Sequence, residues 1–200
     1  MANTKPNFEK DLKEIKKSVN KICDLLGYSD SKMDTAKHSK ARDFSKPEWR
    51  LFHFGKEEYE LATADKNGVL VFRDAIFEAP FDDKEDWRDC TNDWEKCTLK
   101  PLLLKWFEDN APQILKDNYD VDLLSEEEIF GENKLEMFKD WHNRIKGLKG
   151  EEHSTWWWTK TANRGYVHYA IGVHPTGNRS SNDAYYTFGV VPCLRPKHQK

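Results

Sequence analysis

Three consecutive tryptophans, Trp156–Trp158, constrain the fold more than any other feature of this sequence. They open a segment that runs to Gly189 and contains eight Phe, Trp and Tyr residues but only four Lys, Arg, Asp and Glu residues. Aromatic side chains in such a segment either pack in a core or stack on a ligand. In a strand, Trp156 and Trp158 share one face and Trp157 takes the other. We expect at least one of the three to be a core residue, and we expect Trp157 to contact a ligand.

Composition places the chain among folded proteins. Charged residues make up 34% of it, but aromatic residues reach 13%, and 32 basic residues nearly balance 35 acidic ones. This aromatic area is enough to form a core, and 200 residues fit one domain with a short appendage. A net charge of −3 is far from the basic footprint of a nucleic-acid-binding protein, so no nucleic-acid partner is expected.

No segment predicts export or membrane insertion. The longest apolar runs, Leu102–Leu104 and Trp156–Trp158, are far shorter than a membrane span. The Lys-rich first thirty residues lack the apolar stretch of a signal peptide. We expect a protein that is cytoplasmic as synthesised or associated with a virion. Its four cysteines are then expected to be free thiols: Cys23, Cys90, Cys97 and Cys193.

Residues 1–28 are predicted to form an amphipathic helix. Apolar residues between Phe8 and Leu26 follow a heptad spacing, Pro6 lies near the first turn, and Gly27 follows the last apolar position. This seam either packs on the protein's own domain or pairs with a second chain in a homo-oligomer. Residues 29–47, rich in Ser, Lys and Asp, are predicted to be a linker, and residues 48–200 are predicted to be a folded domain.

The folded domain is predicted to be α+β. Strands are expected over 49–54, 59–63 and 69–72, the last two joined by a turn at Asn67-Gly68. Helices are expected over 98–109, from a capping box at Ser125 and Glu128, and around Met137, Trp141 and Ile145. Towards the C-terminus we expect a strand over 166–173, a polar loop over 176–183 and a last strand over 186–194.

The C-terminal segment has the composition of an adaptable binding surface. Between its apolar residues, Tyr, Ser, Asn, Gly and Arg predominate, as they do in antibody loops. Alternation along 166–173 places Tyr166 and His168 on one face of the expected strand. The scaffold beneath them is expected to include Val167, Ile171, Val190 and Leu194. The same composition also fits an ordinary polar loop between two strands.

The sequence contains no motif that predicts catalysis or metal binding. Cys90 and Cys97 are seven residues apart, but they have no second cysteine pair and no histidine at zinc spacing. His168 and His174 form only a weak pattern, and Glu126–Glu128 fits a solvated helix start. No nucleotide-binding, serine-hydrolase or zinc-protease motif occurs. We therefore expect no enzyme activity, no cofactor and no metal.

Several short motifs occur in a distinctive order over residues 48–196. They are Trp49-Arg50-Leu51, Leu70-Val71-Phe72, Pro80-Phe81-Asp82, Trp94–Lys100, Asp120–Glu128, Trp157–Thr161 and Gly189–Leu194. In this order of motifs the chain resembles a widespread family of bacterial and phage domains related to the formylglycine-generating enzymes. The resemblance implies an α+β, C-type lectin-like fold with small mixed or antiparallel sheets and two or three helices.

Departures from the family pattern limit what the resemblance implies. The formylglycine-generating enzymes use two nearby C-terminal cysteines, whereas this chain has only Cys193 there, in an apolar strand where an inert thiol is expected. The strings Glu78-Ala79-Pro80 and Asn92-Asp93-Trp94 do not fit the calcium motifs of true C-type lectins. Lys160 and Val191 stand where the family usually has arginine. Neither oxidase activity nor calcium-dependent sugar binding is therefore expected.

A subset of this fold serves as the variable proteins of diversity-generating retroelements, in which adenine-directed mutagenesis rewrites a C-terminal segment. Residues 156–189 resemble that subset in their mixture of Tyr, Asn, Ser, His, Arg and Asp. The resemblance implies a non-catalytic protein that recognises a protein or glycan ligand on a host or neighbouring cell surface. The residues expected to contact that ligand are Trp157, Lys160, Asn163, Arg164, Tyr166, His168, Asn178, Arg179, Ser181, Asn182, Asp183 and Tyr185. A divergent enzyme of the formylglycine-generating type and a structural oligomeric subunit are the alternatives.

Overall fold

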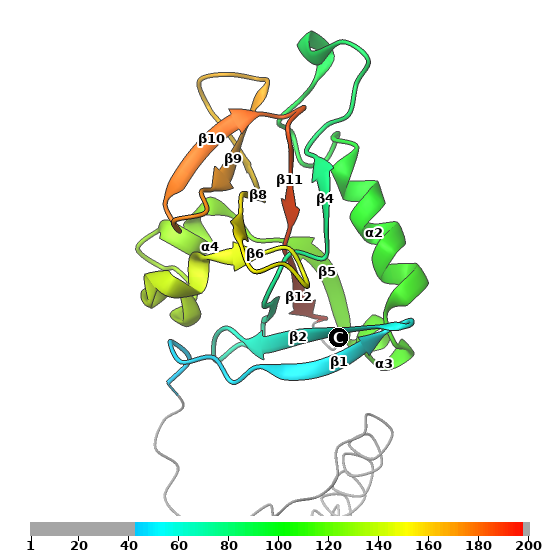
Figure 1. Ribbon diagram of the computed structural model, residues 1–200, viewed down its shortest axis with the longest axis vertical. Helices are drawn as coiled ribbons and strands as arrows, with labels where there is room; N and C mark the ends of the chain where they lie inside the picture. Colours follow the sequence, from blue (N-terminus) through cyan, green and yellow to red (C-terminus); the bar gives the residue numbers. More distant parts are fainter. Residues whose placement is uncertain (1–42, 198–200) are drawn as a thin grey trace, which may run out of the picture. The chain divides into compact units, whose positions relative to one another are not determined.

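The computed structural model describes residues 43–197, which belong to one compact unit, Asp43–Lys200 (Figure 1). The predicted helix over 1–28, its Phe8–Leu26 seam and the predicted linker as far as residue 42 lie outside the described residues. Within 43–197, no helix is both long enough and apolar enough to cross a membrane.

Two five-stranded sheets form the centre of the described unit. The first has the order β1 (Arg50–Phe54), β2 (Glu57–Thr63), β3 (Leu70–Phe72), β12 (Pro192–Pro196), β5 (Tyr119–Leu123). The second has the order β10 (Arg179–Asp183), β9 (Tyr169–Val173), β8 (Trp157–Ala162), β11 (Thr187–Val190), β4 (Phe77–Pro80). All neighbouring strands are antiparallel except β8 and β11, which run parallel. A short ribbon of β6 (Lys146–Gly147) and β7 (Ser154–Thr155) completes the strands.

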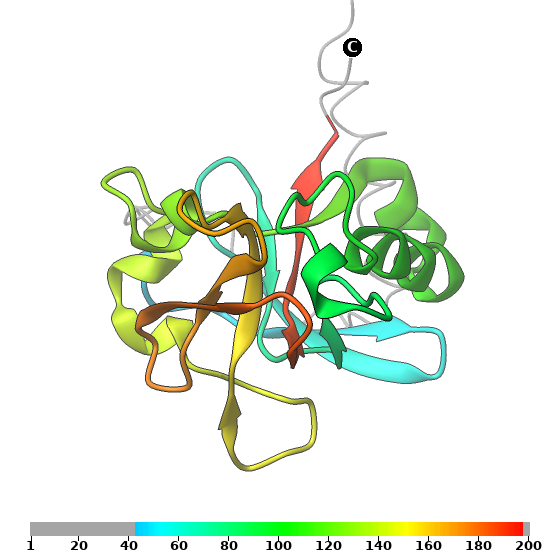
Figure 2. The ribbon, with the colours of Figure 1, turned by 90° about the horizontal axis from the view of Figure 1, so that it is seen from above.

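Three α-helices flank the sheets, so the predicted α+β class is confirmed. They are α2 (Leu99–Asn110), α3 (Gln113–Asn118) and α4 (Glu126–Phe130). Seen from above, α2 and α4 lie on opposite sides of the strands between them (Figure 2). α2 matches the helix predicted over 98–109, and it buries Leu99, Leu103 and Phe107 on one face. α4 starts at the predicted capping box, in which Ser125 accepts from the Glu128 N–H and the Glu128 side chain accepts from the Ser125 N–H.

The predicted β2–β3 hairpin is also confirmed. Leu61 pairs with Phe72 and Thr63 with Leu70. Gly68 closes the turn with a φ of +82°, a value that residues with a side chain rarely adopt. The Asp65 carboxylate accepts from the N–H groups of Asn67 and Val69, which fixes the turn from within.

The helix predicted around Met137, Trp141 and Ile145 is wrong. Two short 3₁₀ turns, η2 (Glu136–Lys139) and η3 (Trp141–Arg144), occupy this stretch. The side chain of Asp140 accepts from the His142 N–H, so a new cap starts in the middle of the expected helix. Met137 is buried, whereas Trp141 is exposed, so the apolar spacing did not mark one continuous face.

The C-terminal strands differ from the prediction in two ways. The polar stretch Arg179–Asp183, expected to lie in a loop, forms β10 and pairs with β9. The single last strand expected over 186–194 is two strands, because the chain leaves the second sheet as β11 and enters the first as β12. Val190, Val191, Cys193 and Leu194 are fully buried along this crossing, which joins the two sheets through one core.

Candidate functional site

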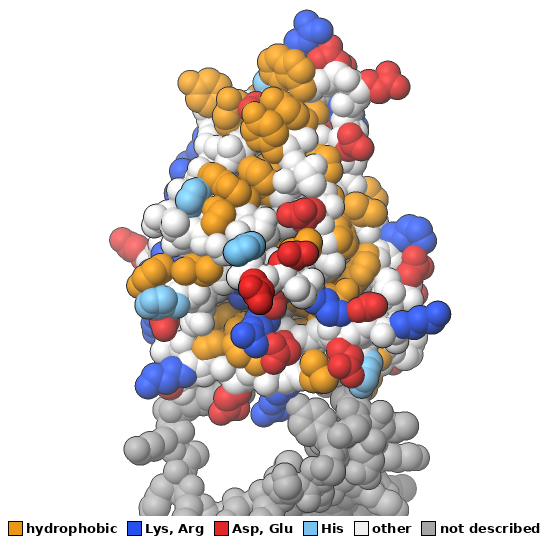
Figure 3. Space-filling model, in the orientation of Figure 1, with side chains coloured by type: hydrophobic (Ala, Val, Ile, Leu, Met, Phe, Trp, Pro, Cys, Tyr) orange, Lys and Arg blue, Asp and Glu red, His pale blue; other side chains and the backbone are white. Residues whose placement is uncertain are grey.

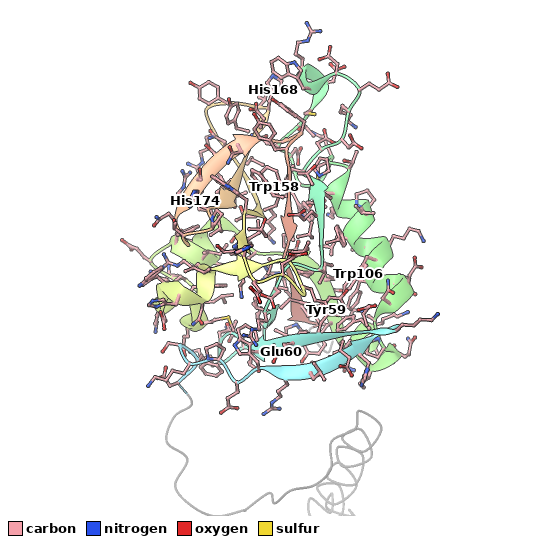
Figure 4. All side chains as sticks on the ribbon, viewed as in Figure 1. Tyr59, Glu60, Trp106, Trp158, His168 and His174 are labelled. Carbon is pink, nitrogen blue, oxygen red and sulfur yellow. The ribbon has the colours of Figure 1, made fainter. Side chains whose placement is uncertain are left out.

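A continuous row of aromatic rings, which we call the aromatic ridge, lies on one side of the second sheet. Each ring contacts the next, with centroid separations of 5.7, 6.3, 4.7, 6.3, 5.1 and 4.5 Å. In order, the ridge residues are His168, Trp87, Tyr185, Tyr186, Phe188, Trp156 and His174. Figure 4 labels the two ends of this row, His168 near the top and His174 lower down beside β9 and β10.

The upper end of the ridge is the most exposed part. Trp87 is 50% exposed, Tyr186 43% and Tyr185 38%, whereas the other four rings are half-buried. Hydrophobic side chains gather at the top of the face shown in Figure 3, above the strands of the second sheet. Rings with this much free surface can stack on a ligand, and the tyrosine hydroxyls can form hydrogen bonds with it.

Trp87 is positioned by a loop that leaves β4 and returns at α2. It lies in the 3₁₀ turn η1 (Trp87–Asp89), which the side chain of Asp86 caps by accepting from the Arg88 N–H. The fully buried Asp82 closes the base of this loop. Its two carboxylate oxygens accept from the N–H groups of Thr91 and Thr98, at 2.9 and 3.0 Å. One side chain therefore ties together the two ends of the loop that presents Trp87.

Asn92 links the same loop to the turn between β8 and β9. Its amide nitrogen lies 2.9 Å from the carbonyl oxygens of Asn163, Tyr166 and Tyr169, and its backbone N–H donates to the Val167 carbonyl. The Nδ1 atom of His168 lies 3.0 Å from the Cys90 carbonyl oxygen. Two segments far apart in sequence are thus fixed against each other at the top of the ridge. The Asn92 side chain therefore has a structural role at this junction.

The β8–β9 turn corrects the predicted scaffold. β9 begins at Tyr169, so residues 166 and 167 precede the strand and do not alternate across it. Val167 is 67% exposed, as is Tyr166, and the expectation that Val167 is a scaffold residue is wrong. Ile171, Val190 and Leu194 are fully buried, which confirms their predicted scaffold role.

The three consecutive tryptophans differ from the prediction in which of them is buried and which reaches the surface. Trp157 was expected to contact a ligand, but it is fully buried, and its indole N–H donates to the Arg144 carbonyl. Trp158 is fully buried as well and donates to the Ala79 carbonyl, which confirms that at least one of the three is a core residue. β8 is an inner strand covered on both faces, so alternation sends both side chains into the interior. Trp156, just before the strand, is the member that reaches the ridge.

Lys160 belongs to an ion-pair network inside the domain. Its amine contacts Asp122 at 2.5 Å, and Arg195 contacts the same carboxylate at 3.2 Å. Arg195 also pairs with Glu128 through two nitrogens, at 2.7 and 2.9 Å. Burial raises the pKa of Glu128, but the hydrogen bonds from Arg195 and Ser125 outweigh it and hold that pKa below its usual value. The charge of Lys160, which was predicted to contact a ligand, is therefore paired within the domain.

Three predicted contact residues line a groove beside α4. The groove has a volume of about 540 Å³, and Asn163, Arg164 and Arg179 lie along it together with Glu126 and Thr161. Arg179 forms an ion pair with Glu126, so it is paired within the chain, whereas Arg164 is exposed and has no carboxylate partner among the described residues. No residue that lines this groove belongs to the aromatic ridge.

The remaining predicted residues follow the outer strand of the second sheet. Ser181, Asn182 and Asp183 are half-buried on β10, and Asn178 is exposed in the preceding turn, where its amide donates to Thr176. The Asn182 amide nitrogen is buried and has no hydrogen-bond partner within the described residues. Of the twelve predicted contact residues, His168 and Tyr185 lie on the ridge itself, and Tyr166 lies on the turn that Asn92 ties to the ridge loop.

Five ridge residues were not predicted as contacts: Trp87, Trp156, His174, Tyr186 and Phe188. The sequence does carry a signal for Trp87, because it is a lone tryptophan among the charged residues of 82–89. A tryptophan in such a stretch has no apolar neighbours to form a buried face, so exposure is the simpler expectation.

A slightly larger hollow, of about 580 Å³, lies along the β1–β2 hairpin. It contains none of the predicted contact residues, and Tyr59 and Glu60 in its lining are labelled in Figure 4. Its lining is dominated by charged side chains, and Lys149 pairs with Glu57 at 2.5 Å across it. We therefore place the candidate site on the ridge, where several rings are exposed together.

Comparison with known families finds one match. The model of a domain of unknown function, DUF6273, matches residues 116–196. This region runs from α3 to the end of β12 and includes every ridge residue except Trp87. No curated protein and no solved structure matches the chain.

The described cysteines are free and buried: Cys90, Cys97 and Cys193. Burial raises the pKa of the Cys193 thiol to about 12, which disfavours the reactive thiolate form. Within residues 43–197, no group of three His, Cys, Asp or Glu side chains is arranged to hold a metal ion. What the ridge offers chemically is stacking area with hydroxyl, imidazole and indole groups at its edges.

Proposed function

We propose that this chain is a non-catalytic ligand-binding protein and that the aromatic ridge is its recognition surface. The observation that carries the proposal is the gathering of rings from separate segments, with Trp87, Tyr185 and Tyr186 each more than a third exposed. Rigid aromatic side chains with polar tips supply most of the energy at many recognition surfaces. An exposed cluster of this kind costs solubility, and such patches usually mark binding sites.

The scaffold in this proposal is a C-type lectin-like domain of the formylglycine-generating-enzyme-like superfamily. Two small sheets, one of them mixed, and three helices are compatible with that fold. Several motif residues have structural roles that a shared scaffold would preserve. Asp82 closes the ridge loop, and Asp122 and Glu128 form the ion-pair network.

The protein is further proposed to be a variable protein of a diversity-generating retroelement. Exposed and buried positions interleave within residues 156–189, as a diversified segment on a fixed framework would require. Trp157, Ile171 and Val173 are fully buried there, whereas Tyr166 and Tyr185 are exposed. The ligand is a protein or glycan on a host or neighbouring cell surface. The ridge rings act as anchors, and Asn163, Asn178 and Ser181 form the adjustable polar margin.

Sequencing the coding segment for residues 156–189 across many copies of the locus tests this function. Substitutions are expected at adenine positions in the codons of exposed or half-buried residues such as Tyr166, His168 and Tyr185. The codons of Trp157, Ile171 and Val173 should remain constant, and so should that of Trp87, which lies outside the segment. A near-copy repeat beside a reverse transcriptase gene should accompany this pattern.

Two results would contradict the retroelement proposal. The first is a constant segment with no template repeat. The second is variation spread equally over buried and exposed codons, which would indicate neutral drift in place of directed diversification. Either result would leave open a fixed binding surface on the same ridge.

A further inference from the structure

The loop that carries Trp87 has an excess of free negative charge. Each of its basic side chains between residues 82 and 100 is paired with a carboxylate: Lys84 with Asp82, Arg88 with Asp86, Lys96 with Asp93 and Lys100 with Glu95. Three exposed carboxylates form no ion pair within 4 Å among the described residues, although Asp89 attracts Arg88 at longer range: Asp83, Glu85 and Asp89. The loop therefore presents acidic groups to solvent but no unpaired cation.

The opposite margin of the ridge adds to this charge. Asp183, at the end of β10, precedes Tyr185 by two residues and has no basic partner among the described residues. A hydrogen bond with Tyr186 and the negative charge of Asp183 contribute to raising the pKa of Tyr185 to about 12. In the face shown in Figure 3, acidic side chains border the hydrophobic cluster at the top, together with a basic group at the tip. The one unpaired cation of residues 156–189, Arg164, lines the α4 groove.

Cations of the described residues lie over other aromatic rings but not over these ridge rings. Arg144 lies over Phe130, Lys146 over Trp49 and Lys149 over Tyr59, with the charged group 4.3 to 5.0 Å from the ring centroid. Within residues 43–197, no Lys or Arg is placed in this way over Trp87, Tyr185 or Tyr186. These rings are free to take a cation from outside, and indole is the best aromatic partner for one.

We propose that the ridge binds a polypeptide segment that presents lysine or arginine side chains. This inference rests on the proposed function and specifies the ligand of the same surface. A cationic head over Trp87 or Tyr185 meets the ring face and the surrounding carboxylates together, so two attractive effects act at one place. A sulfated or sialylated glycan brings negative charge to Asp83, Glu85, Asp89 and Asp183 and is disfavoured there.

The test measures binding of the full chain to three probes by titration calorimetry at low salt. The first probe is a peptide with four lysines separated by glycine and serine, and the second is the same peptide with each lysine acetylated. The third is a sulfated hexasaccharide. Acetylation removes the charge and keeps the rest of the probe, so the first two probes isolate the cation. The lysine peptide is expected to bind about tenfold more tightly than the acetylated one.

Variants locate the binding. Trp87→Ala and the triple change Asp83→Asn/Glu85→Gln/Asp89→Asn are each expected to weaken lysine-peptide binding about fivefold to tenfold. A control triple, Glu132→Gln/Glu151→Gln/Glu152→Gln, removes the same charge from carboxylates outside the ridge and should change binding less than about twofold. Urea unfolding of each variant checks that it remains folded, as expected for substitutions at exposed positions.

Three outcomes overturn the inference. Equal weakening by both triple variants means that net charge, not the ridge, attracts the peptide. If the sulfated hexasaccharide binds and Trp87→Ala abolishes this binding, the ligand is anionic and not cationic. The ridge would then remain a recognition surface. If Trp87→Ala leaves the binding of all three probes unchanged, the inference is overturned. Sequencing of the locus then tests the proposed function separately.

Discussion

Lys146 lies in an environment that is unusual for a lysine, because it is buried. The residue is 2% exposed, and among the described residues its amine has one hydrogen-bond acceptor, the Phe72 carbonyl at 3.2 Å, with the Trp49 ring at 5.0 Å. Burial lowers the pKa of Lys146 to about 7, although Asp74 opposes the shift. The pKa of a lysine in the unfolded chain is about 10.4. Between these two values the unfolded state binds more protons than the folded state, so this residue makes the free energy of unfolding rise with pH.

Replacing Lys146 by methionine should stabilise the protein at neutral pH. Methionine has a similar length and no charge to bury, so Lys146→Met is expected to raise the free energy of unfolding at pH 7 by about 1–3 kcal/mol. The gain should be largest below pH 7 and should shrink between pH 7 and pH 10, because the free energy needed to deprotonate the wild-type amine on folding falls as the pH approaches its unfolded-state pKa. Urea unfolding at pH 6, 7 and 9 measures this difference.

Lys139→Met is the matched control, because it makes the same chemical change at an exposed position. It should alter the free energy of unfolding by less than about 0.5 kcal/mol at every pH. Destabilisation by Lys146→Met, with no dependence on pH, would show that the Lys146 amine stabilises the fold.

At the residue level, local chemistry was predictable and burial was not. The Ser125–Glu128 cap follows from residues three apart, and it forms as predicted. Trp157 was assigned to the surface because alternation gives two faces, but alternation does not say whether both faces are covered. Lys160 was predicted to contact a ligand, and its ion pair with Asp122 could not be predicted because the two residues are distant in sequence.

Among the structural elements, β11 depends on a glycine for its place between β4 and β8. A Cβ atom at Gly189 would lie 2.8 Å from the Ala75 Cβ and 3.0 Å from the Trp156 carbonyl oxygen. Gly189→Ala is therefore expected to destabilise the protein by about 1–3 kcal/mol, because the strands would have to separate. Gly165→Ala is the control, since its Cβ would meet only the Asn163 side chain at 3.4 Å. Equal thermal midpoints for the two variants would contradict this account of the strand packing.

The loop that carries Trp87 should depend on Asp82. Asp82→Ala removes both acceptors that tie the ends of the loop and leaves the Thr91 and Thr98 N–H groups without them. The expected cost is about 2–4 kcal/mol, with faster amide hydrogen exchange over residues 83–98. Asp82→Asn keeps one acceptor oxygen and should cost less. Unchanged exchange over the loop in Asp82→Ala would contradict the proposed role of this carboxylate.

Prediction at the level of elements succeeded where the apolar pattern decided the structure. The β2–β3 hairpin and α2 have clear periodicity, and both were predicted within a few residues. β10 has the sequence Arg-Ser-Ser-Asn-Asp, which is typical of a loop, and it becomes a strand through its pairing with β9. Polar residues suit an outer strand because they discourage further pairing, so composition alone could not distinguish the two.

At the level of the whole described unit, a fixed scaffold carries the upper ridge on its surface. The crossing from β11 to β12 joins the two sheets through buried side chains, and Trp158 packs directly beneath Phe188 at 4.4 Å. The gathering of the ridge could not be predicted, because Trp87 meets His168 and Tyr185 only through the fold of the Asp82 loop. If the upper ridge is a recognition surface, its rings contribute little to holding the scaffold together.

Urea unfolding of two variants tests this separation most directly. The triple variant Trp87→Ala/Tyr185→Ala/Tyr186→Ala removes the three exposed rings, and the single variant Trp158→Ala removes a fully buried ring that packs against Phe188. The triple variant is predicted to lose less than about 2 kcal/mol of unfolding free energy, since exposed ring contacts are weak. Trp158→Ala is predicted to lose about 3–5 kcal/mol, because it leaves a cavity in the core. A triple variant that loses as much as Trp158→Ala would make the upper ridge part of the scaffold and would contradict the central claim.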